Sequence, residues 1–120
     1  MPPAAVSETP AEAQTTGGQP THCCPLYHRS IEMVGKRWTG AILMVLMEGA
    51  LRFSEIGATI PDVSDRLLSE RLKELEAEGI VERHVLGGSP VGVEYALTEK
   101  GRALEPAVEA LKAWAQTWHR

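Results

Sequence analysis

Apolar side chains recur at helical spacing in several stretches of the chain, each bounded by a glycine, a proline or a capping residue. The spacing predicts a first helix over Leu26 to Val34 and a second over Arg37 to Glu48. The second stretch is apolar on nearly every face, so we expect a central, buried helix there. Gly35 and Gly49 follow these stretches and are expected to end the two helices.

Two more helices are predicted from residues that favour helix N-caps. Ser54 is expected to cap a short helix that runs to Thr59, and Ser64 to cap one over Asp65 to Glu78. Gly79 is the predicted C-cap of the longer helix. Its core stripe is expected to consist of Leu68, Leu72 and Leu75.

At the start of the last third of the chain, the spacing of apolar residues changes from helical to alternating. Residues alternate between large apolar and other types over Val91 to Leu97, which predicts a hairpin with Ile80 to Leu86 across a loop of Gly87, Gly88, Ser89 and Pro90. Thr98 is expected to cap one final helix that Pro106 kinks. Apolar residues repeat along that helix with the spacing of a coiled-coil seam, at Leu104, Val108, Leu111, Ala115 and Trp118.

The resulting order is helix, helix, short strand over Ala50 to Phe53, helix, helix, hairpin, helix. This order is typical of a winged helix-turn-helix domain, an α+β fold that is mainly α. An unrelated α+β domain with the same element string is the alternative. Residues 1–20 hold few large apolar side chains and are expected to form a disordered tail before a domain over residues 21–120.

The composition narrows the class of protein. Hydrophobic residues make up 43% of the chain, but no apolar run is long enough to span a membrane. The N-terminal residues lack the order of a signal peptide, so a cytoplasmic protein is expected. The neighbours Cys23 and Cys24 cannot build a disulfide framework. No motif of a phosphate loop, a zinc protease or a serine hydrolase is present, which disfavours an enzyme.

The formal net charge of −4 argues at first against a nucleic-acid partner. Two of the acids lie in the tail, and others gather at Glu74, Glu76, Glu78, Glu105 and Glu109. If Leu68 faces the core, the outward face of its helix carries Ser64, Asp65, Arg66, Ser69, Glu70 and Lys73. Arg37, Arg52 and Ser54 lie near helix N-termini, where phosphates bind. For each of the four cations an ordinary solvated side chain is the alternative; they are Arg37, Arg52, Arg66 and Lys73. Arg71 is expected to pair locally with Glu74.

Several blocks of the sequence are similar to one family of regulators. They are Cys24-Pro25, Val34 to Thr39, Arg52 to Ile56, Leu68 to Gly79 and Val93 to Gly101. In this order and spacing they resemble the HxlR-type branch of the MarR-like winged-helix transcriptional regulators. The resemblance implies a homodimeric bacterial DNA-binding protein with a recognition helix in the major groove and a wing at Gly87, Gly88 and Ser89. It also implies a dimer built by the first and last helices, with Leu104, Val108, Leu111, Trp114, Ala115 and Trp118 at the interface.

Several members of that family sense oxidants or electrophiles through the cysteine of the N-terminal Cys-Pro, which implies Cys24 as the sensor candidate. In other members this cysteine has only a structural role, which is the alternative for Cys24. A thiol near a helix N-terminus with His28 and Arg29 close by suits that chemistry. Cys23 beside it departs from the family pattern and is a second candidate. The wing departs too, because Gly92 stands where many relatives carry a basic residue.

The sequence therefore predicts a homodimeric DNA-binding regulator, most simply a repressor, that needs no cofactor. A winged-helix adaptor that binds proteins instead of DNA is the first alternative, favoured by the acidic total and the uncharged wing. A metal-responsive regulator is the second, because His22, Cys23, Cys24 and His28 are all acceptable ligands for zinc or copper.

Overall fold

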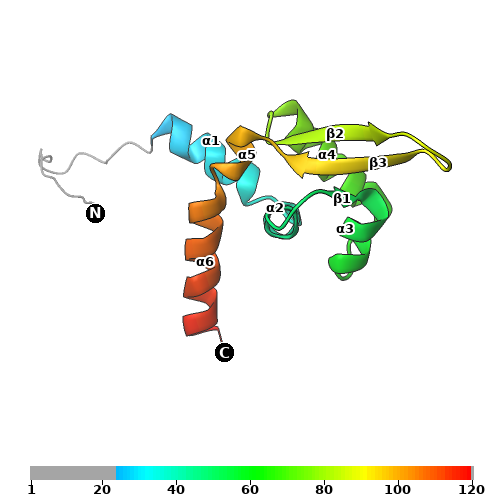
Figure 1. Ribbon diagram of the computed structural model, residues 1–120. Helices are drawn as coiled ribbons and strands as arrows, with labels where there is room; N and C mark the ends of the chain where they lie inside the picture. The colour runs from blue at the N-terminus through cyan, green and yellow to red at the C-terminus, as the bar shows by residue number, and fades with distance from the viewer. Residues whose placement is uncertain (1–23, 120) are drawn as a thin grey trace, which may run out of the picture. The chain divides into compact units, whose positions relative to one another are not determined.

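A computed structural model of the chain describes residues 24–119 (Figure 1). The chain divides into two compact units, residues 1–31 and residues 32–120. The predicted tail lies outside the described residues. The elements are α1 Pro25–Val34, α2 Thr39–Leu46, β1 Leu51–Arg52, α3 Phe53–Thr59, α4 Asp65–Ala77, β2 Val81–Leu86, β3 Gly92–Leu97, α5 Glu99–Arg102 and α6 Glu105–Trp118.

The three strands form an antiparallel sheet in the order β1-β3-β2. In the β2–β3 hairpin, Val81 faces Leu97 and Leu86 faces Gly92, and the hairpin projects past α3 and α4 as a wing (Figure 1). The core forms where α2, α3 and α4 meet the inner face of this sheet. Its most deeply buried side chains are Ile42, Leu43, Leu46, Ile56, Leu68, Leu72, Leu75 and Val81. The winged helix-turn-helix fold and the predicted stripe on α4 are confirmed.

The central helix α2 is shorter than predicted and is not buried all round. It begins at Thr39 because Trp38 has a φ of 79°, a left-handed conformation that a right-handed helix does not accommodate. Met44 is 43% exposed, so one side of α2 faces away from the core of this chain. Apolar periodicity predicts neither the left-handed conformation of Trp38 nor the exposure of Met44.

The N-cap of α3 is Arg52 and not Ser54. The backbone N–H of Arg52 donates to Glu55 Oε1 at 2.7 Å, which orders the start of the helix. Ser54 is exposed in the first turn of α3. The prediction that Ser54 caps this helix is therefore wrong by two positions.

The cap at Ser64 is confirmed, because its Oγ accepts the Leu67 backbone N–H at 3.1 Å. Ser64→Ala is expected to lower the free energy of unfolding by about 1 kcal/mol, the usual contribution of such a cap. Ser54→Ala is the matched control and is expected to change it by less than about 0.5 kcal/mol. Urea denaturation of both variants measures the difference. Equal losses would mean that Ser54 also caps a helix.

The predicted final helix is two helices, α5 and α6, with Pro106 in the first turn of α6. Proline is tolerated there because the first N–H groups of a helix have no intrahelical partner. The helix therefore starts near Pro106 instead of bending at it. Thr98 does cap α5, since its Oγ1 accepts the Gly101 N–H at 3.1 Å. No helix within residues 24–119 is long and apolar enough to cross a membrane.

Candidate nucleic-acid interface

Helix α4 presents its N-terminal half to solvent. Ser64, Asp65, Arg66 and Lys73 are exposed, and Ser69 and Glu70 are half-buried on its flanks. Leu68 and Leu72 anchor the opposite side in the core. The structure thus brings the predicted recognition residues onto one face of one helix, which is the placement that major-groove reading requires.

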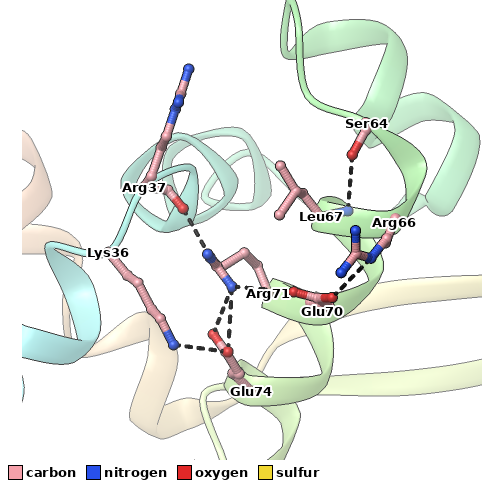
Figure 2. A network of polar contacts seen from close by, with 8 residues as sticks. All are labelled: Lys36, Arg37, Ser64, Arg66, Leu67, Glu70, Arg71 and Glu74. Carbon is pink, nitrogen blue, oxygen red and sulfur yellow. Dashed lines mark hydrogen bonds and ion pairs between the residues drawn. The ribbon is translucent and has the colours of Figure 1, made fainter.

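Arg71 fixes α4 to the turn that precedes α2 (Figure 2). Its Nε donates to the backbone carbonyl of Arg37 at 3.0 Å, and its Nη1 lies 3.3 Å from Glu74 Oε2. The side chain is only 13% exposed. The sequence indicated Arg71 as a local partner of Glu74, and that pair exists, but the bond to Arg37 spans 34 positions and has no local signal.

Lys36 reinforces the same junction, with its Nζ 2.9 Å from Glu74 Oε2. The side chain of Arg37 points away from this network, and its guanidinium lies 4.8 Å from the centre of the Trp38 ring (Figure 2). Lys36 and Arg71 thus neutralise Glu74, whereas Arg37 stays directed outward. The indole Nε1 of Trp38 is buried without a hydrogen-bond partner among the described residues.

Charge pairing separates the proposed DNA-facing cations from most others. Within residues 24–119, Arg37, Arg52 and Lys73 form no ion pair with a carboxylate. Arg66 pairs with Glu70 at 3.4 Å, but its side chain is 86% exposed, so this pair is easily exchanged for another partner. Lys112 on α6 is likewise outside any ion pair in the part of the chain described. The predicted face therefore holds positive charge that the fold leaves available.

Two acids form ion pairs away from the outward face of α4. Glu76 lies 3.9 Å from Arg83, and Glu105 lies 3.9 Å from Arg102. Arg83 in turn sits opposite Tyr95 across the hairpin. Burial raises the pKa of the Tyr95 phenol above its ordinary value, although the nearby Arg83 guanidinium acts in the opposite direction. The Tyr95 hydroxyl is therefore neutral near pH 7.

The wing residues Gly87, Gly88 and Ser89 are exposed in the turn between β2 and β3. Gly88 has a φ of 104°, a conformation that glycine adopts without strain. Gly92 opens β3 directly after this turn and lies under the side chain of Arg52. The turn itself carries no charge, as the sequence indicates.

The sensor and metal candidates are only partly described. Cys24 is exposed and its backbone carbonyl accepts the His28 N–H at 2.9 Å, which places Cys24 at the start of α1. Cys23 and His22 lie outside the described residues. Within residues 24–119 no group of three His, Cys, Asp or Glu side chains is arranged to hold a metal ion.

The predicted dimer face on α6 is largely exposed. Leu111 is 66%, Trp114 52% and Trp118 71% exposed, which is unusual for large apolar side chains that share one helix face. Leu104 and Val108 instead pack against the core of their own chain. A groove of about 310 Å³ runs beside this face and includes Met44, Val108, Leu111 and Ala115. Met44 thus extends the apolar surface onto α2, although its place in the apolar run predicted a core position.

Known proteins share this sequence and fold. The HxlR-like helix-turn-helix family matches residues 33–120. YodB of Bacillus subtilis, an HTH-type transcriptional regulator, is 52% identical over 92 residues, covering 77% of this chain and 82% of YodB. YvaP of the same organism, an uncharacterised HTH-type transcriptional regulator, is 47% identical over 95 residues, covering 79% of this chain and 88% of YvaP.

The solved structure of reduced YodB superimposes with a TM-score of 0.72 and 49% identity, covering 81% of this chain and 95% of that one. YodB has also been solved after diamide treatment and with quinone bound. The family match covers most of the chain and includes α4, the wing and α6. The chain therefore belongs to the HxlR-like helix-turn-helix family of transcriptional regulators, and not to a family of enzymes.

Proposed function

We propose that the protein is a homodimer that binds a pseudo-palindromic operator and represses transcription by covering it. The observation that carries the proposal is the outward face of α4, where exposed polar side chains stand beside cations that the fold leaves outside ion pairs. Two such helices in a dimer would enter successive major grooves about one helical turn apart. Ser64, Asp65, Arg66, Ser69, Glu70 and Lys73 are the proposed base-reading residues.

The backbone contacts are assigned to Arg37, Arg52 and Ser54. Arg37 is an exposed cation next to α4, because its carbonyl accepts the Arg71 Nε–H. Arg52 is an exposed cation at the N-terminus of α3, and Ser54 offers a backbone N–H in the first turn of that helix. Selection of bound fragments from genomic DNA tests the whole proposal. Enrichment of one palindromic sequence supports it, and no enrichment over bulk DNA would oppose it.

Arg66 and Arg52 are expected to contribute to DNA binding in different ways. Arg66→Ala should weaken binding to the selected operator by about 1–3 kcal/mol and leave binding to random DNA nearly unchanged, because it removes a side chain that reads a base. Arg52→Ala should weaken both and lower the salt dependence by about one unit per protomer, because it removes a cation that neutralises a phosphate. Fluorescence anisotropy on both duplexes across a salt series measures these effects.

Lys112→Ala is the control for loss of a cation outside the α4 face, since Lys112 lies on α6 and forms no ion pair within the described residues. Lys112 also lines the groove beside the proposed dimer face, so the dimeric state of this variant is measured alongside its affinity. It is expected to leave the specific affinity unchanged. If Arg66→Ala and Arg52→Ala reduce specific and random binding equally, the assigned roles are wrong.

The dimer is proposed to form through the exposed apolar face of α6. Leu111, Trp114 and Trp118 are large apolar side chains that are more than half exposed on one face of α6, and Met44 continues this apolar surface on α2. A second copy of the chain would cover this surface. The same pairing would set the spacing of the two α4 helices on DNA.

Cys24 is proposed as an electrophile sensor. It is exposed, at the start of α1, and the related YodB has been solved with a quinone bound. The Cys24 thiolate would add to a ring carbon of a quinone, forming one S–C bond while the quinone gains two electrons and becomes a hydroquinone thioether after protonation. A quinone adduct on Cys24, at the start of α1, would weaken operator binding.

Treatment with benzoquinone is expected to add one adduct per chain and to release the operator. Cys24→Ser should abolish the release, whereas Cys23→Ser should retain it. Intact-protein mass spectrometry and anisotropy measure the adduct and the release on the same samples. Release that persists in Cys24→Ser and disappears in Cys23→Ser would transfer the sensor to Cys23.

A further inference from the structure

The wing has no cation of its own at its tip. Residues Gly87 to Val91 are uncharged, and Gly92 begins β3 directly after them. Wings that bind DNA approach a phosphate backbone, so an uncharged wing has only backbone N–H groups and the Ser89 hydroxyl to offer. On the strands of the hairpin, Arg83 lies 3.9 Å from Glu76 and His84 lies 3.1 Å from Glu82. A cation outside any ion pair would therefore have to reach the wing turn from another element.

Arg52 is placed to supply it. In the sheet, Arg52 of β1 is paired with Glu94 of β3, and Gly92 is two positions before Glu94 on the same face. A Cβ atom built on Gly92 would lie 2.5 Å from Arg52 Nη1 and 3.1 Å from its Cζ. The guanidinium therefore occupies the volume that any side chain at position 92 would need.

The guanidinium remains available in this position. Among the described residues it forms no ion pair, even with Glu94, and Arg52 is exposed. It runs along the outer face of β3 toward the wing turn instead. The side chain of Arg52, which is the N-cap residue of α3, thus ends beside Gly92 at the wing turn.

We propose that Gly92 is a positioning residue: its lack of a side chain leaves room for the Arg52 guanidinium beside the wing turn, and β1 thereby supplies the phosphate-binding cation of the wing. The inference rests on the proposed DNA binding. It differs from a plain phosphate contact by Arg52, because it makes the effect of Arg52 depend on the absence of a side chain at position 92.

A double-mutant cycle tests this dependence. Gly92→Ala should displace the guanidinium and weaken binding at 0.15 M salt by about fivefold for each phosphate that is no longer neutralised, with a matching decrease in salt slope of about one unit per protomer. Arg52→Ala should do the same. In the Arg52→Ala background, Gly92→Ala is expected to have no further effect. Anisotropy with operator DNA measures all four proteins.

Gly40→Ala on α2 is the matched control, because it adds the same methyl group outside the wing and a Cβ there would meet nothing within 4 Å. It is expected to leave affinity and slope unchanged. Thermal melting should show all variants folded, since the clash at Gly92 is with the end of a flexible side chain. A second readout is rescue: Arg52→Ala with Gly92→Arg returns a guanidinium to the same place and should recover the salt slope.

Failure of the positioning role and failure of the proposed DNA binding would give different results. Additive effects of Gly92→Ala and Arg52→Ala, or no rescue by Gly92→Arg, would overturn the positioning role while leaving DNA binding intact. Absence of operator binding by the unmodified protein would instead overturn the proposed function on which the inference rests.

Discussion

Leu111→Glu is expected to abolish dimerisation and to weaken operator binding by about 100-fold or more, because each protomer then binds its half-site alone. Leu111 is 66% exposed, so a carboxylate at this position is solvated in the monomer but buried without a partner in a dimer. The folded monomer should therefore persist while the pair dissociates. Analytical ultracentrifugation and anisotropy measure the two consequences.

Ala113→Glu is the matched control on α6. It introduces the same charge on the exposed face roughly opposite Leu111 and away from Trp118. Dimer and affinity should both be unchanged. If Leu111→Glu remains dimeric with full affinity, the apolar face of α6 is not the dimer interface.

Gly101→Ala is expected to destabilise the domain by about 2–3 kcal/mol, a cost typical of overpacking against atoms that cannot move. A Cβ on Gly101 would overlap the backbone carbonyl oxygen of Ile80. That carbonyl also accepts the Thr98 N–H at 3.0 Å, so it is held in place. The end of α4 and the start of α5 meet at this junction, where Lys100 Nζ donates to the Glu78 carbonyl at 2.6 Å.

Gly40→Ala provides the comparison within α2, where a new Cβ meets nothing within 4 Å. Gly40 is the second residue of α2, and alanine at a position with compatible backbone angles should stabilise by about 0.4–1 kcal/mol, because it restricts the unfolded chain. Urea denaturation should therefore move in opposite directions for the two variants. A stabilising Gly101→Ala would contradict the close approach of α5 to Ile80.

Features set by near neighbours in the sequence are the ones that sequence patterns predict. The Ser64 cap, the Leu68, Leu72 and Leu75 stripe and the two hairpin strands each follow from local pattern and are confirmed. The outward face of α4 follows in turn, since a helix with a fixed core stripe has a fixed solvent face.

Long-range contacts account for what local patterns miss. The left-handed Trp38 shortens α2, and the adjacent Arg37 carbonyl is bound by Arg71 from α4. The Arg52 side chain lies over Gly92 only because β1 pairs with β3, and this pairing joins segments about forty positions apart. The division of α5 from α6 was misjudged for a different reason, because Pro106 fits both a kink within a helix and the first turn of a new one.

The central claim is sequence-specific DNA binding through α4. Its most direct test is the ratio of dissociation constants for the selected operator and a scrambled duplex of the same length, measured by anisotropy at 0.15 M salt. The account predicts a ratio of at least about 10³ for the intact protein, in the range of specific regulators. Equal affinities, or no binding by a protein shown to be dimeric, would contradict it and favour a winged-helix adaptor that binds proteins.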